Sequence, residues 1–73
     1  SVYPNPTQDY WNIDGLNIEI TQIEIFDILG KKVKSIEPYS TEVSISSAEF
    51  EDGMYFATIY TSKSKSVIRL IKK

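Results

Sequence analysis

The amino-acid sequence predicts an all-β domain folded as a sandwich of two antiparallel sheets. About seven short runs rich in Ile, Val, Thr, Tyr and Phe recur roughly every 8 to 12 residues, with Gly or Pro between them, which is the pattern of a β-sandwich. Ala occurs only twice and Leu three times, so residues that favour helices are scarce. A small closed barrel is the alternative, because the longest run is apolar on both faces and needs a layer on each side.

The first elements are an entry turn and a short strand. Tyr3-Pro4-Asn5-Pro6 holds two of the three prolines, so we expect a stiff, extended entry to the domain. Residues 10–13 are the first strand, and Asp14-Gly15 ends it in a tight turn with positive φ. The alternation of apolar and polar residues from Leu16 to Ile20 predicts that the next strand begins there.

A hairpin is predicted in the middle of the chain. Residues 23–28 continue the strand pattern, and Gly30 supplies the left-handed residue that follows a type I turn. Because Ile25 and Ile28 fall on opposite phases of a regular strand, we expect the backbone to bend near Asp27. Residues 32–36 form the returning strand, and a loop with the third proline follows it.

The second half of the chain contains three further strand candidates. Residues 41–46 alternate cleanly and place Val43 and Ile45 inward. The loop over residues 46–53 holds at most one helical turn, and the strand over residues 54–61 follows it as the longest and most central strand. The final strand, residues 67–71, ends in two lysines.

Composition excludes several classes of function. The chain has no Cys and no His, so it lacks disulfides, thiolate metal sites and the commonest general base. Its net charge of −2 argues against a nucleic-acid partner, and no run approaches the ~20 apolar residues of a membrane-spanning helix. The start at Ser1, without Met or a signal peptide, indicates that residues 1–73 are a single domain cut from a longer protein.

Few residues are candidates for chemistry. Glu49, Glu51 and Asp52 form the densest carboxylate group, but carboxylates in a polar loop are expected to be solvated rather than tuned for acid–base catalysis. We therefore expect no catalytic residues, no cofactor and no metal site, with a loop-bound calcium ion as a minority alternative. Trp11 and the other aromatic rings suit stacking on sugars, yet in a small sandwich they are expected to fill the core.

Four segments taken together resemble the C-terminal sorting domain of the type IX secretion system, also called the Por secretion system, of Bacteroidetes. The segments are Tyr3–Thr7, Ile25–Val33, Gly53–Phe56 and Arg69–Lys73. In this order and at these spacings they span nearly the whole chain. The sequence departs from the family pattern at residues 50–52, where a Leu-Pro-Ser-like segment is usual, and at Arg69, where Lys is more usual.

This resemblance implies an immunoglobulin-like β-sandwich of about seven short antiparallel strands that acts as a non-catalytic C-terminal sorting signal. It implies a cargo protein that passes through the periplasm, is read by the outer-membrane secretion machinery, and is then attached to the cell surface or secreted. A sortase-like processing peptidase would cut near or upstream of Ser1. A small carbohydrate-binding or adhesive β-sandwich is the alternative function.

The resemblance and the strand pattern together point to the end of the chain for recognition. Arg69, Leu70, Ile71, Lys72 and Lys73 are the candidate recognition residues, because the family carries its export signal in the terminal residues. A terminal strand can also pair with the edge of a receptor sheet.

The remaining candidate residues lie at the start of the chain and in two turns. Tyr3-Pro4-Asn5-Pro6 would hold the junction to the cargo stiff and extended, where a processing enzyme can reach it. Gly30 and Gly53 are expected to maintain turns rather than to be recognised.

Overall fold

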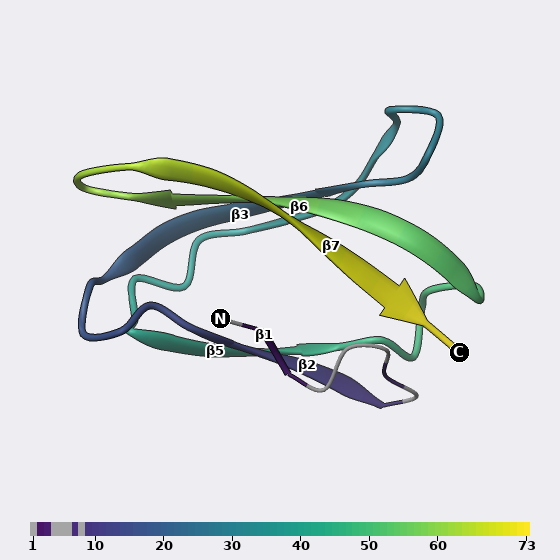
Figure 1. Cartoon of the computed structure of the whole chain (residues 1–73), viewed down its shortest axis with the longest axis horizontal. Coiled ribbons are helices and arrows are strands. Elements are labelled where there is room, and N and C mark those ends of the chain that lie inside the picture. The colour runs from purple at the N-terminus through teal and green to yellow at the C-terminus, as the bar shows by residue number, and fades with distance from the viewer. Residues whose placement is uncertain (1, 4–6, 8) are drawn as a thin grey trace.

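Two antiparallel β-sheets packed face to face form the computed structural model, which describes residues 2–3, 7 and 9–73 (Figure 1). The three-stranded sheet has the order β1-β2-β5, with β1 at Val2–Tyr3, β2 at Tyr10–Asp14 and β5 at Glu42–Ser46. The four-stranded sheet has the order β4-β3-β6-β7, with β3 at Ile20–Phe26, β4 at Lys32–Ile36, β6 at Gly53–Thr61 and β7 at Lys65–Lys72. The predicted all-β sandwich is therefore confirmed, and the closed barrel is wrong because the strands are divided between two separate sheets.

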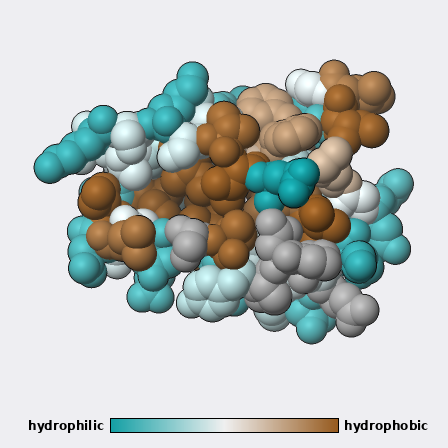
Figure 2. Space-filling view, viewed as in Figure 1, coloured by the Kyte–Doolittle hydropathy of each residue, from teal (hydrophilic) through white to brown (hydrophobic). Residues whose placement is uncertain are grey.

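The hydrophobic core lies between the two sheets and is built from alternate residues of the strands. Trp11 of β2 is fully buried and meets the ring of Phe50 edge to face, with the ring centroids 5.3 Å apart. Phe50 meets Tyr55 in the same way at 5.0 Å, which continues the aromatic contact onto β6. The buried apolar residues of this core are Trp11, Ile13, Ile20, Ile23, Ile25, Ile45, Phe50, Ala57, Ile59 and Leu70. In Figure 2, apolar surface is visible between the two layers on the side viewed.

The β3–β4 hairpin forms as predicted. The Oδ1 atom of Asp27 accepts hydrogen bonds from the backbone N–H groups of Leu29 and Lys31, each at 2.9 Å, and these bonds fix the turn. Gly30 lies in this turn with φ +85°, a conformation that side chains with a Cβ disfavour. The register of β3 against β4 shifts between Ile25 and Phe26, directly before the predicted bend.

The segment between β2 and β3 differs from the prediction. Residues 15–19 form a loop rather than the start of a strand, and β3 begins only at Ile20. Leu16 has φ +55° and is 69% exposed, because the carboxylate of Asp14 accepts the Leu16 N–H at 2.7 Å and closes a side-chain turn. Gly15 is needed for close approach instead of for positive φ, since a Cβ there would lie 2.3 Å from the carbonyl oxygen of Ile18.

The outer face of β6 also differs from the prediction. β6 is an inner strand of its sheet, but Met54 and Phe56 remain 40% and 37% exposed, so no second layer covers them. Farther along this face Glu24 accepts hydrogen bonds from the Tyr60 hydroxyl at 2.8 Å and from the Lys32 amine at 3.2 Å. The sheet thus needs only one covered face, because the other mixes apolar residues with polar groups that pair with one another.

Candidate functional site

The candidate recognition residues lie on β7, the last strand and one edge of the four-stranded sheet. β7 pairs with β6 from Lys65 opposite Tyr60 to Lys72 opposite Gly53. Successive side chains of a strand point to opposite faces, and Leu70 points into the core, where it is fully buried. In the folded domain Leu70 is therefore not presented to a receptor, whereas the side chains of Arg69 and Lys73 are exposed.

Thr7, which follows the entry turn in the sequence, pairs with the end of β7. Thr7 forms a parallel bridge with Lys72: its backbone N–H donates to the Ile71 carbonyl at 2.9 Å, and its carbonyl accepts the Lys73 N–H at 2.9 Å. The Thr7 side chain is locked as well, because its hydroxyl donates to the Tyr10 carbonyl at 2.6 Å. The segment that follows the proline-rich entry and the end of the chain are thus joined by backbone hydrogen bonds.

A second set of hydrogen bonds joins the same two regions through the loop after β5. The backbone N–H and the hydroxyl of Ser47 both donate to the Asp9 carbonyl, at 2.7 Å and 2.8 Å. The Ser47 carbonyl in turn accepts the Nζ of Lys72 at 2.7 Å. We call the set Thr7, Asp9, Ser47 and residues 71–73 the terminal clasp. It links the three-stranded sheet to the edge of the four-stranded sheet.

Sequence reasoning did not single out Thr7 or Ser47 as partners of the chain end. Neither residue belongs to an alternating strand pattern. The bonds that Thr7 and Ser47 make with the end of the chain also join residues far apart in the sequence. The one available signal was the place of Thr7 in the entry segment that resembles the sorting-domain family. Of the junction residues, Tyr3 lies in β1 opposite Asn12 and is about half exposed, whereas Pro4, Asn5 and Pro6 lie outside the described residues.

Of the two glycines singled out from the sequence, one lies in a turn and the other begins a strand. Gly30 occupies the β3–β4 turn, and Gly53 begins β6 with φ +144°. No other group lies within 4 Å of the position that a Cβ would take at either residue. The backbone conformation, and not the surrounding space, therefore favours glycine at both positions.

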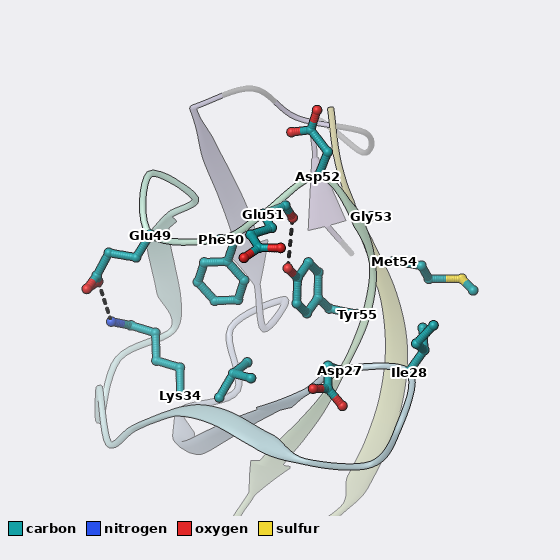
Figure 3. A pocket seen from close by; sticks show the side chains of 11 residues that line it. Asp27, Ile28, Lys34, Glu49, Phe50, Glu51, Asp52, Gly53, Met54 and Tyr55 are labelled. Carbon is teal, nitrogen blue, oxygen red and sulfur yellow. Dashed lines mark hydrogen bonds and ion pairs between the residues drawn. The ribbon is translucent and has the colours of Figure 1, made fainter.

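A hollow of about 450 Å³ lies beside the β3–β4 turn and the loop before β6 (Figure 3). Its floor includes the rings of Phe50 and Tyr55, and the Tyr55 hydroxyl donates to the Glu51 carbonyl at 2.7 Å. Burial, followed by the negative charge of Glu51, raises the pKa of Tyr55 above its ordinary value of 10.0. Glu49 on the rim pairs with Lys34 at 3.6 Å.

The carboxylates around this hollow do not form a catalytic pair. Glu49, Glu51 and Asp52 are exposed, and Asp52 points away from the two rings in Figure 3. The carboxylate of Glu49 is paired with Lys34, and the side chains of Glu51 and Asp52 are open to solvent. Among the described residues, no group of three or more His, Cys, Asp or Glu side chains is placed to hold a metal ion.

Trp11 does not provide the sugar-stacking platform that the sequence left open. The Trp11 ring is fully buried against Phe50, so it cannot stack on a ligand in the folded domain. Its Nε1 atom has no hydrogen-bond partner within the described part of the chain. In the same residues no helix is long and apolar enough to cross a membrane.

Comparison with known proteins identifies one family and two individual relatives. A family model described as the secretion system C-terminal sorting domain matches residues 1–73. The ulvan lyase NLR42 of Nonlabens ulvanivorans is 32% identical over 65 residues, which are 88% of this chain and 12% of the enzyme.

Among solved structures, PorZ of Porphyromonas gingivalis, described as an essential bacterial surface component of the type IX secretion system, is similar to the whole of this chain. The TM-score is 0.79 at 27% sequence identity, and the match covers 11% of the PorZ chain. The chain therefore spans about an eighth of the length of the lyase and about a ninth of that of PorZ.

Proposed function

The chain belongs to the family of secretion system C-terminal sorting domains, and from this premise we propose that it directs a cargo protein through the type IX secretion system across the outer membrane. The match of the family model to all 73 residues carries this proposal. The likeness to PorZ supports it, because that component of the same secretion system contains a similar sandwich in a much longer chain. The lyase shows that a similar segment forms part of a much longer enzyme.

The proposed route begins in the periplasm, where the cargo arrives with this domain attached. The secretion machinery of the outer membrane then reads the folded domain, and the cargo reaches the cell surface or the medium. A sortase-like peptidase cuts near or upstream of Ser1. Within this route the domain acts as a signal and not as a catalyst.

Within this route, the side chains at the end of the chain are the proposed contacts with the machinery. Arg69 and Lys73 are exposed, and Lys72 holds the clasp through Ser47. Leu70 serves the core. The recognition role is therefore assigned to the exposed basic side chains, and the buried residue supports them from below.

Secretion of a fused reporter in a Bacteroidetes host tests this function. Deletion of residues 69–73 should trap the reporter in the periplasm. Because this deletion also removes Leu70 from the core, the double variant Arg69→Gln with Lys73→Gln should be tested alongside it, and it should reduce secretion while the fold is kept. The matched control is Lys31→Gln with Lys63→Gln, which removes two exposed charges from remote turns. Normal secretion of the deletion variant would contradict the proposal.

A further inference from the structure

We infer that Thr7 is a positioning residue that fixes the end of the chain within the terminal clasp, so that the secretion machinery meets the last residues as part of an ordered surface. This inference rests on the proposed function and extends it from the terminal residues to the terminal clasp. It assigns recognition to a three-dimensional arrangement rather than to a linear tail.

Thr7 is held in place by burial and by two hydrogen bonds of its hydroxyl group. Its side chain is 4% exposed, although threonine in a loop is usually solvated. The hydroxyl donates to the Tyr10 carbonyl at 2.6 Å and accepts the N–H of Asp9 at 3.2 Å. These two bonds use both the donor and an acceptor of one hydroxyl group, and they fix the residue relative to β2.

Thr7 in turn holds the end of β7 through its backbone. Its N–H and its carbonyl both bond to β7, one on each side of Lys72. A strand that ends a chain normally frays, because its last residues have few partners. Here the Lys73 N–H is bonded to the Thr7 carbonyl, so the order of the last residue depends on Thr7.

The amine of Lys72 donates a hydrogen bond within the clasp. Its Nζ lies 2.7 Å from the Ser47 carbonyl, and Ser47 is fully buried. Ser47 also donates twice to the Asp9 carbonyl. Asp9 thus fixes the loop after β5, and that loop holds the lysine. Lys72 therefore anchors the chain end, and the exposed side chain of Lys73 projects from a fixed backbone.

Together these contacts explain how a short terminal sequence can be read with precision. A flexible tail loses conformational freedom when it binds, and this loss weakens the affinity. A tail that is already ordered by Thr7 avoids most of that loss.

The test combines amide hydrogen exchange on the 73-residue chain with secretion of the fused reporter. Thr7→Val keeps the shape of the side chain and removes both hydroxyl bonds. We expect it to speed the exchange of the Thr7 and Lys73 amides about tenfold, as for the loss of one or two hydrogen bonds, while the core amide of Ile23 is little changed. We expect secretion of the reporter to fall by a similar factor.

Two further variants make the readout specific. Thr7→Ser keeps the hydroxyl and should restore both slow exchange and secretion, which a loss of general packing at this residue would not do. Thr41→Val changes an exposed threonine on another loop and should leave both readouts at the level of the unchanged chain.

The inference is overturned if Thr7→Val leaves the Lys73 amide as slow as before, or if that amide exchanges faster and secretion stays normal. Failure of the proposed function has a different signature. In that case deletion of residues 69–73 would leave secretion intact, whatever Thr7→Val does. If the deletion blocks secretion and a loosened clasp does not, the sorting function stands and only the role of Thr7 falls.

Discussion

Replacement of Leu70 by alanine separates the structural part of the terminal strand from the part that is recognised. Leu70 lies in the segment that the family resemblance marks for export, yet its side chain is fully buried in the core. The structure therefore predicts that Leu70→Ala impairs secretion by unfolding the domain. Lys73→Ala changes an exposed side chain of the same segment and should leave stability nearly unchanged.

The size of the effect follows from the burial of the side chain. Leu70→Ala removes three carbon groups, worth about 2.4 kcal/mol of transfer free energy at ~0.8 kcal/mol each. The cavity left behind adds to this loss, so we expect a total of about 3 to 5 kcal/mol. A domain of 73 residues has an unfolding free energy of about 4 to 11 kcal/mol, so the substitution removes a large part of it.

Equilibrium unfolding in urea measures this loss directly. Trp11 is the only tryptophan and is fully buried, so its fluorescence reports the unfolding of the core. With a slope of about 1 kcal/mol per molar urea, the midpoint should fall by roughly 3 M or more in Leu70→Ala and by less than about 0.5 M in Lys73→Ala.

A loss of less than about 1 kcal/mol in Leu70→Ala would refute the reasoning, because a fully buried leucine with an unrelaxed cavity cannot be that cheap to remove. Equal losses in the two variants would refute it as well. They would mean that the end of β7 does not contribute to the core in the way the structure shows.

The remaining predictions concern the core, the turns and the polar pair on the outer face. Ile59→Ala on β6 should cost about 2 to 5 kcal/mol in the same urea assay. Gly15→Ala should lower the unfolding free energy by about 2 to 3 kcal/mol because the new Cβ would meet the backbone of Ile18. Gly30→Ala should lower it by only about 1 kcal/mol because the space around that turn is open. The reverse order would show that positive φ matters more than close approach. Hydrogen bonds from Tyr60 and then Lys32 lower the pKa of Glu24 below 4.5, so the stabilisation of the fold by the Glu24 carboxylate is complete at higher pH and is lost as the pH falls through the lowered pKa. Glu24→Gln should flatten this loss of stability in acid, measured as urea midpoints from about pH 3 to 7. An unchanged pH profile would count against a stabilising role for the hydrogen bonds of Glu24.

The strands were predictable because period-two alternation depends on neighbours in the sequence. The β3–β4 hairpin could be placed from Gly30 and the flanking apolar runs, and the inward side chains of β5 could be assigned from Val43 and Ile45 alone. The same rule failed at Leu16, where apolar residues alternate in a loop. There the hydrogen bond from the Leu16 N–H to Asp14 decides the local conformation, and periodicity does not register it.

The candidate site was less predictable because its geometry depends on long-range contacts. The sequence marks residues 69–73 as a group, but only the fold separates buried Leu70 from exposed Lys73. Thr7 and Lys72 lie at opposite ends of the chain, and no local pattern indicates that they pair. The pairing of β7 with β6 places Lys72 opposite Gly53, after the loop that carries Ser47, and the bridge between Thr7 and Lys72 completes the clasp.

The central claim is that this domain is a sorting signal for type IX secretion. Its most direct test is the localisation of a fluorescent protein with a Sec signal at its N-terminus and this chain at its C-terminus, in a Bacteroidetes host with and without a working type IX translocon. If the domain is such a signal, the fluorescent protein reaches the surface or the medium only when the translocon works. Retention of the protein in the periplasm of both hosts, with the domain folded, would contradict it.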